Sequence, residues 1–222
     1  MRMNRIDHLT QKRVIFWTSL IKHTTELDAE IVYLLNQHLT TGPPQPINKK
    51  GKRLVQSSVP FPQPDITRVV DTQITTAELV GHEKSLGKYY QQILALAQEH
   101  ELPVSAIRHY FWLRLWIWNS DEEAYLYFPW YDTLSEIDPV LDALQSDRNG
   151  TLFRDADQGW RMEIAADDHF FYFHQFQDTK AGTGTVLLRT EREDLRVKAK
   201  VLQERIHCQV GRFPVFISRP IR

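Results

Sequence analysis

The chain has 222 residues, of which 42% are hydrophobic and 25% charged, and these values are typical of a globular protein with one well-buried core. Its formal net charge of −1 argues against a general nucleic-acid binder, because such proteins are usually basic overall. The single cysteine, Cys208, excludes an internal disulfide, and no apolar run reaches the roughly 18 residues of a membrane span. We therefore expect a cytoplasmic protein without a signal peptide or a membrane span.

The first predicted element is a helix from Thr10 to Leu39, because apolar residues recur there at three- and four-residue steps. These residues are Trp17, Leu20, Ile21, Leu27, Ile31, Leu34 and Leu35. We assign residues 1–39 to an N-terminal helical segment.

A connection rich in proline follows at residues 40–65 and holds six of the eleven prolines. Proline at alternate positions in Pro60, Pro62 and Pro64 forbids a helix and favours an extended backbone. A basic patch at residues 49–53 lies inside this connection. The patch suits a nucleic-acid contact, but four charges in a loop are more often just solvated.

A second helix is predicted from Thr76 to His100, with its buried face at Leu79, Leu86, Tyr90, Ile93, Leu94 and Ala97. Alternating side chains then predict a hairpin of two strands, Tyr110–Trp118 and Ala124–Phe128. A helix through Ile107–Trp118 is the alternative. A short helix is expected at Leu134–Leu144, with Pro139 as a break or restart.

The last third of the chain is predicted to hold four strands and a closing helix. The strands are Thr151–Phe153, Trp160–Ala165, Phe170–Phe176 and Thr185–Arg189, with a tight turn at Asp167-Asp168. Thr190 and Glu193 match a capping box at the start of the helix. The core face of this helix is Leu195, Ala199, Leu202, Ile206 and Val210.

This order of elements predicts an α+β fold, with a mainly antiparallel sheet packed by helices. Residues 66–222 form the α+β domain in this interpretation. The N-terminal helix and the Pro-rich connector either precede it as separate parts or belong to a single domain overall.

Charge is distributed unevenly along the chain. Residues 121–170 hold thirteen Asp and Glu but three basic residues, which gives −10, so the remainder of the chain carries +9. An acidic region of this size would repel phosphates and makes nucleic acid an unlikely partner. It points instead to a positively charged protein partner.

The most individual local sequence is Phe153–Glu163. Asp155, Asp157 and Glu163 offer oxygen ligands of the kind that Mg²⁺ and Ca²⁺ prefer, but Gly159 falls where an EF-hand loop needs a ligand. A turn before a strand that begins at Trp160 is the favoured interpretation. An exposed acidic turn of this kind can also bind a partner.

No other pattern specifies chemistry. His169 and His174 are five apart on one predicted strand, so their side chains point to opposite faces. No metal-binding His/Cys spacing and no cysteine-enzyme signature are present, and Gly182-Thr183-Gly184 lacks the remaining residues of a phosphate loop. We predict no catalytic residue, no metal and no cofactor.

The stretch from Leu152 to Gly211 resembles small immunity-type proteins encoded beside bacterial polymorphic toxins. The residues that carry this resemblance are Asp155, Asp157, Gly159, Trp160 and Glu163, the Phe-rich strand Phe170–Phe176 and the closing helix Glu191–Val210. The resemblance covers about a quarter of the chain. It implies an α+β scaffold that covers a toxin's basic active site with an acidic surface and carries out no catalysis.

Three hypotheses for the function follow. The first is a protein-binding module, and in particular an immunity protein that neutralises a basic toxin domain, with contacts at Asp155, Asp157, Trp160, Glu163, Asp167 and Asp168. The second is a metal-dependent hydrolase using Asp155, Asp157 and Glu163. The third is a structural or oligomerising protein that uses the Thr10–Leu39 helix as an arm on a neighbouring copy.

Overall fold

The computed structural model describes residues 24–41, 57–119, 124–126, 128–179 and 182–213. These residues form antiparallel sheets and helices, so the protein has the predicted α+β fold. The chain divides into two compact units. Unit 1 comprises residues 1–30, 115–129 and 136–205, and unit 2 comprises residues 31–114, 130–135 and 206–222. The predicted division at residues 39 and 65 stays a prediction.

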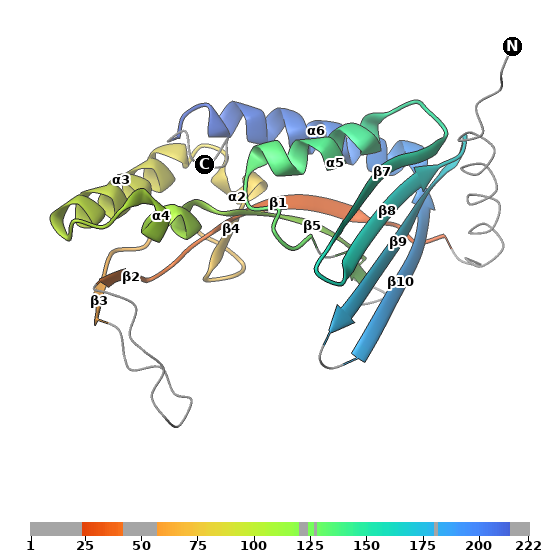
Figure 1. The fold of residues 1–222 in the computed structure, drawn as a ribbon. Helices are drawn as coiled ribbons and strands as arrows, with labels where there is room; N and C mark the ends of the chain where they lie inside the picture. The colour runs from red at the N-terminus through yellow and green to blue at the C-terminus, as the bar shows by residue number, and fades with distance from the viewer. Residues whose placement is uncertain (1–23, 42–56, 120–123, 127, 180–181, 214–222) are drawn as a thin grey trace, which may run out of the picture. The chain divides into compact units, whose positions relative to one another are not determined.

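Unit 1 is built on a four-stranded antiparallel sheet with the order β10-β9-β8-β7 (Figure 1). Its strands are β7 (Gly150–Asp157), β8 (Trp160–Ala166), β9 (Phe170–Thr179) and β10 (Gly182–Glu191). Each strand pairs with the next along the chain, which is the simplest antiparallel arrangement. The predicted strands are confirmed, and β7, β9 and β10 run further than expected.

The hairpin between β7 and β8 turns on two residues, Gln158 and Gly159, since Asp157 pairs with Trp160. Both turn residues have positive φ, +43° and +87°, which matches the mirror-image turns that fit the twist of a hairpin. The structure therefore places Asp155 and Asp157 at the end of a strand, whereas we expected them in the turn itself.

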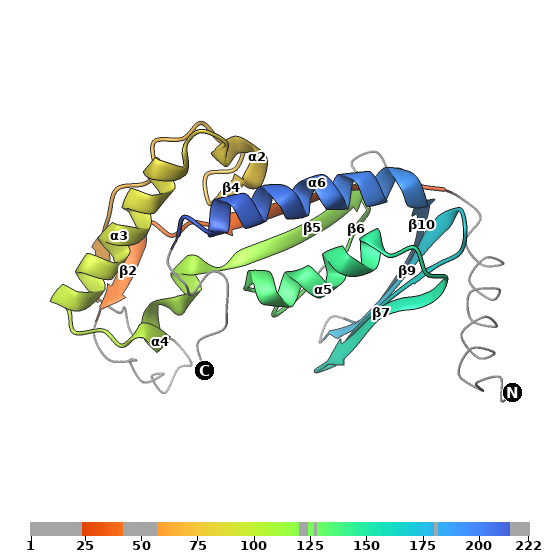
Figure 2. The ribbon, with the colours of Figure 1, turned by 90° about the horizontal axis from the view of Figure 1, so that it is seen from above.

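Two helices accompany this sheet in unit 1, and Figure 2 shows both on one side of it. They are α5 (Leu134–Gln145) and most of α6 (Arg192–Val210). Gln203 of α6 donates to Asp142 of α5 over 2.9 Å, and Gln145 donates to Gln203 over 2.5 Å. The predicted core face of α6, from Leu195 to Val210, is buried.

Two expectations about these helices are wrong. Pro139 lies inside α5, which continues through it; the missing N–H costs one backbone hydrogen bond, and the buried neighbours Ile137, Val140 and Leu141 hold the helix. The capping box does not form, because Thr190 pairs with Phe171 as part of β10 and α6 begins at Arg192.

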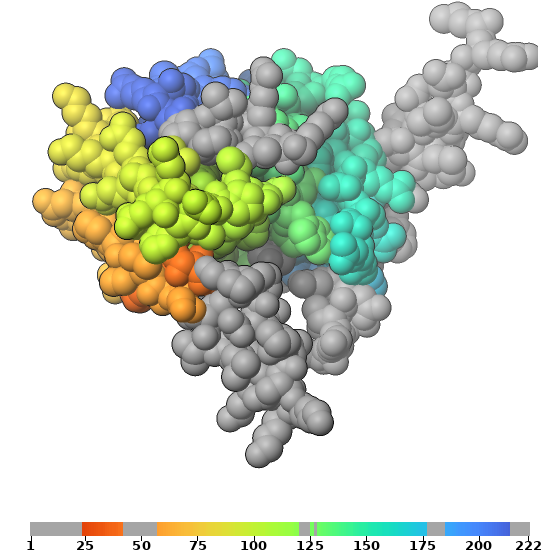
Figure 3. All heavy atoms as spheres, turned by 60° about the vertical axis from the view of Figure 1, so that its left-hand side comes forward, coloured from red at the N-terminus to blue at the C-terminus, as the bar shows by residue number. Residues whose placement is uncertain are grey.

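Unit 2 contains β2 (His38–Thr41), β3 (Ser57–Pro60), β4 (Gln73–Thr75), α2 (Thr76–Leu79), α3 (Glu83–Glu99), α4 (Val104–Ile107) and the 3-10 helix η1 (Arg108–Phe111). The space-filling view in Figure 3 shows α3 and α4, coloured yellow to lime green, side by side at its surface. The predicted helix Thr76–His100 is present but divided, because the chain turns at Gly81 with φ +82°.

An aromatic core fixes unit 2. Tyr89, Tyr90, Tyr110 and Phe111 are all buried, and the rings of Tyr90 and Phe111 lie 5.0 Å apart. The Tyr110 hydroxyl accepts from the Thr40 N–H and donates to the His38 carbonyl, which ties β2 to η1. These bonds use the polar end of the Tyr110 ring while its body fills the core.

The predicted helix over Thr10–Leu39 is wrong where the structure describes it, because Asp28–Leu34 forms strand β1. Val32, Tyr33 and Leu34 of β1 pair with β4. Three consecutive residues, Ile31 to Tyr33, are buried, so β1 is covered on both faces and its apolar positions mimic helical spacing. Residues 10–23 lie outside the described residues.

The Pro-rich connection was expected to be extended, and two parts of it, at Thr41 and at Ser57–Pro60, belong to extended strands. β2 and β3 pair in antiparallel fashion, with Thr41 opposite Ser57, so the connection contains a two-stranded ribbon. The basic patch at residues 49–53 lies outside the described residues.

The expected hairpin near residue 118 is confirmed, but its first strand begins at Leu113 rather than at Tyr110. β5 (Leu113–Asn119) pairs with β6 (Ala124–Leu126), and Leu113, Leu115 and Ile117 face the core alternately, as the sequence predicts. The alternative helix is limited to α4 and η1, which end at Phe111. In the part of the chain that the structure describes, no helix has both the length and the apolar character to cross a membrane.

Candidate binding site

Four of the six predicted contact residues flank the two ends of strand β8. Asp155 and Asp157 are beside the turn that precedes β8, and Asp167 and Asp168 form the turn that follows it. Seven residues at about 3.3 Å each separate the two groups by roughly 20 Å. The Debye length near physiological salt is about 8 Å, so the two groups do not act as one acidic surface.

Trp160 and Glu163 cannot serve as contact residues in this conformation, because they are 3% and 5% exposed. The Trp160 ring packs edge-on against Phe128, with centroids 6.4 Å apart. Glu163 accepts a hydrogen bond from Thr151 over 3.2 Å. Both residues belong to the interior of unit 1, so the expectation of a tryptophan anchor is wrong.

The strand register also separates the three carboxylates of the hydrolase hypothesis. Asp155 lies opposite Met162, whereas Glu163 lies opposite Arg154. Neighbouring residues of a strand point to opposite faces, so Glu163 points away from Asp155 and Asp157. Among the described residues, no group of three or more His, Cys, Asp or Glu is arranged to hold a metal ion.

Asp167 organises the turn between β8 and β9. Its carboxylate accepts from the N–H groups of His169 and Phe170, each over 2.8 Å, and from the Tyr172 hydroxyl over 2.6 Å. Burial raises the pKa of Asp167, but these three donors outweigh it and lower the pKa below its usual value. The side chain is therefore committed to the fold rather than free for a partner.

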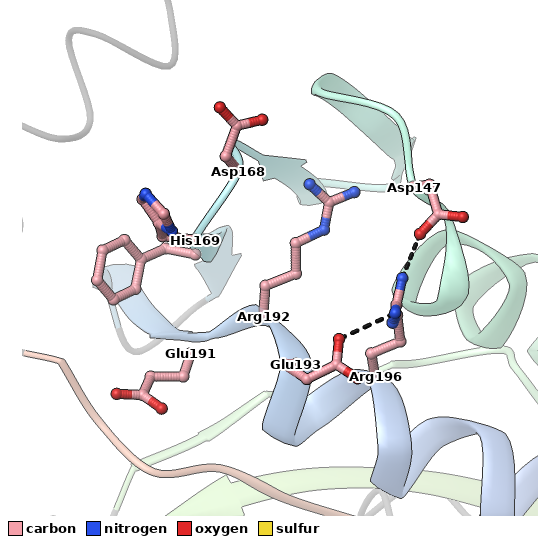
Figure 4. Close-up of a pocket in the computed structure, with 8 residues that line it drawn as sticks. Asp147, Asp168, His169, Glu191, Arg192, Glu193 and Arg196 are labelled. Carbon is pink, nitrogen blue, oxygen red and sulfur yellow. Dashed lines mark hydrogen bonds and ion pairs between the residues drawn. The ribbon is translucent and has the colours of Figure 1, made fainter.

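Several acidic side chains lie around the point where β10 passes into α6. Asp147, Asp168, Glu191 and Glu193 line an open depression of about 590 Å³, and we name these four residues the acidic corner (Figure 4). The remaining lining residues are His169, Phe170, Arg192 and Arg196. Three chain segments contribute: the loop after α5, the turn after β8 and the start of α6.

The two arginines at the acidic corner are already engaged. Arg196 forms ion pairs with Asp147 and, over 3.0 Å, with Glu193. Arg192 is 8% exposed and donates to the carbonyl oxygens of Ser146, Arg148 and Asp167 and to the side chain of Asn149.

Exposure makes the acidic corner available to a partner. The side chains of Asp147 and Glu193 are 86% and 71% exposed, and Asp168 and Glu191 are exposed as well. Four carboxylates face two guanidinium groups, one of them buried, so the depression favours cationic groups. The positive end of the α6 dipole stabilises the carboxylates nearest to it without neutralising them.

A second depression, of about 460 Å³, adjoins the first and shares Glu191. Thr24, Thr25, Glu26, Thr190 and Asp194 complete its lining. Lys198 makes ion pairs with Glu26, Asp28 and Asp194 at 2.9 to 3.3 Å. Desolvation lowers the pKa of Lys198, but these carboxylates outweigh it and raise the pKa above its usual value.

Sequence reasoning found only part of this site. Of the four residues of the acidic corner, Asp168 alone was a predicted contact residue. Glu191 and Glu193 lie beyond the acidic block at residues 121–170, and Glu193 was assigned to a helix cap. A cluster of acids in the first turn of a helix was the available signal, but the same cluster also suits the helix dipole.

Comparison with protein-family models, curated proteins and solved structures finds no match.

Proposed function

We propose that the protein is a non-enzymatic binding module that takes a basic protein partner at the acidic corner. The observation that carries this proposal is that Asp147, Asp168, Glu191 and Glu193 all line one open depression. Lysine or arginine side chains of the partner fit between these carboxylates, where charge-assisted hydrogen bonds are available. An acidic rim of this kind increases association rates and selects against acidic competitors.

The division of charge between the units supports this proposal. Unit 1 contains 21 acidic and 15 basic residues, a net charge of −6, whereas unit 2 contains seven acidic and twelve basic residues, a net charge of +5. The near-neutral total thus conceals one acidic and one basic unit. A basic partner is drawn to unit 1, which carries the acidic corner.

We further propose that the partner is a toxin domain with a basic active site and that the protein neutralises it in the cytoplasm. This step rests on the resemblance of Leu152–Gly211 to immunity-type proteins. An acidic corner would occupy the toxin surface that otherwise meets phosphate groups.

The test is a binding titration against the partner obtained by affinity purification. Asp168→Asn combined with Glu191→Gln removes two charges, keeps side-chain volume and leaves an oxygen that accepts from Asn149. We expect the dissociation constant to rise about tenfold or more at low salt, and the wild-type affinity to fall as salt increases.

The matched control is Asp155→Asn combined with Asp157→Asn, which removes the same charge at the other end of β8. We expect this control to change affinity far less. A partner that binds wild type and both variants equally, or with the same affinity from low to high salt, would refute the proposal. Thermal melts of each variant separate loss of contact from loss of fold.

A further inference from the structure

Strand β10 forms one outer edge of the four-stranded sheet of unit 1 (Figure 1). It runs for ten residues and pairs along its length with β9, from Gly182 opposite Thr179 to Glu191 opposite Phe170. An edge strand presents a row of backbone N–H and C=O groups that can pair with a further strand.

One hydrogen bond shows which residues of β10 point outward. The Thr25 N–H donates to the Arg189 carbonyl over 2.7 Å, so the backbone of Arg189 faces away from β9. In an antiparallel ladder the N–H and C=O of a residue point to the same side, and the side alternates along the strand. The backbones of Thr183, Thr185 and Leu187 therefore also face outward. Among the described residues, the backbone bond from Thr25 covers this edge at Arg189.

The two edges of the sheet differ in their protection. β7, at the opposite edge, has an irregularity between Thr151 and Phe153 and carries Arg154, Asp155 and Asp157. Bulges and charges of this kind prevent an edge from pairing with another chain. The run Gly182–Leu188 of β10 contains no charged residue and no proline. The run Gly182–Leu188 of β10 is thus free of charged residues and proline, whereas β7 carries charged residues and an irregularity in its pairing.

We propose that β10 pairs with β10 of a second copy of this chain, antiparallel and around a two-fold axis. A strand that meets its own copy in this way makes the same contacts in both directions, which is the symmetry of most dimers. An uncharged run pairs with its own copy without like-charge repulsion, whereas two copies of β7 would bring charged side chains together.

The register follows from the limits of the available edge. Thr25 occupies the edge at Arg189, and the strand begins at Gly182, so the stretch of edge that no other described residue pairs with is centred on Thr185. Thr185 then lies opposite its own copy, and Thr183 lies opposite Leu187. The three outward-facing residues of each copy exchange about six backbone hydrogen bonds. The two sheets become one sheet of eight strands.

The experiment measures oligomeric state by sedimentation velocity over a wide range of protein concentration. Thr185→Pro removes an outward-facing N–H, and proline is tolerated at such edge positions without loss of pairing to the inner strand. Thr185→Lys adds an edge charge opposite its own copy and serves where the proline variant fails to fold. The matched control is Ala156→Lys, an exposed position on β7.

We expect wild type and Ala156→Lys to dimerise with increasing concentration, and each Thr185 variant to raise the dimer dissociation constant at least about tenfold. Circular dichroism of the Thr185 variants should match wild type. A wild type that stays monomeric, or a dimer that folded Thr185 variants leave intact, overturns the proposal. Of the acidic-corner residues, Glu191 is the last residue of β10, but it lies outside the proposed pairing stretch Thr183–Leu187, so the acidic-corner variants test the proposed function separately.

Discussion

Arg192 is expected to be one of the most important single side chains for the stability of unit 1. Its guanidinium group is buried and makes four hydrogen bonds: 2.5 Å to the Ser146 carbonyl, 2.8 Å to the Arg148 carbonyl, 2.5 Å to the Asp167 carbonyl and 2.8 Å to the Asn149 side chain. It also lies over the Phe171 ring at 5.6 Å. The first residue of α6 thereby holds the loop after α5 and the turn after β8.

The size of the effect follows from these contacts. Replacing Arg192 by Met removes all four hydrogen bonds and leaves three backbone carbonyls without their partner. Loss of one side of such a buried network costs about 3–5 kcal/mol. For a chain of this length each kcal/mol shifts the melting temperature by about 2–4 °C, so we expect a decrease of roughly 10 °C.

The assay is urea unfolding followed by tryptophan fluorescence, to which the buried Trp160 contributes from within unit 1. The matched control is Arg196→Met, which removes the ion pairs with the exposed Asp147 and Glu193. Exposed pairs contribute little, so the control should cost less than about 1 kcal/mol. Equal effects of the two substitutions would refute the argument, because burial would then not distinguish the two arginines.

Three further predictions concern the turns and the pH dependence. Gly159→Ala should lower the free energy of unfolding by about 1 kcal/mol, because φ of +87° suits glycine, whereas Gln158→Gly should raise it by a few tenths of a kcal/mol or more; both are measured by urea titration. Asp167→Asn should destabilise the protein at neutral pH but less at acidic pH. The folded-state pKa of Asp167 is lowered, so the stability that its carboxylate contributes is present above the unfolded-state pKa and disappears as the pH falls through the folded-state pKa. Burial raises the pKa of Tyr89 to about 12 from 10, so its contribution to the free energy of unfolding is complete below pH 10 and disappears as the pH rises to 12. Unfolding free energies measured across that range should therefore decline, and the decline should be smaller in the variant Tyr89→Phe.

Alternation and helical periodicity predicted the elements whose environment is one-sided. β5 has one buried and one partly exposed face, and α6 has a single buried stripe, so the pattern of each identifies its structure. The prediction for β1 was wrong for the opposite reason. Ile31, Val32 and Tyr33 are buried in succession, and a strand covered on both faces shows no period of two.

Capping and turn signals failed where tertiary contacts decide the boundary. Thr190 and Glu193 have the spacing of a capping box, but pairing with β9 keeps Thr190 in the strand. In the same way, the acids Asp155 and Asp157 suggested a turn, while the turn itself uses Gln158 and Gly159. Local sequence specifies that a turn occurs near these residues, and cross-strand register specifies where.

The acidic block could be counted in the sequence, but its arrangement could not. Strand β8 carries its two acidic turns to opposite ends, and α5 commits Asp138 and Asp142 to hydrogen bonds with Gln203. Meanwhile the end of β10 and the start of α6 bring Glu191 and Glu193 from outside the block to the depression that Asp147 and Asp168 also line. Net charge over a window therefore suggested the charge of the partner that we propose, whereas the proposed site depends on which few carboxylates the fold gathers and leaves exposed.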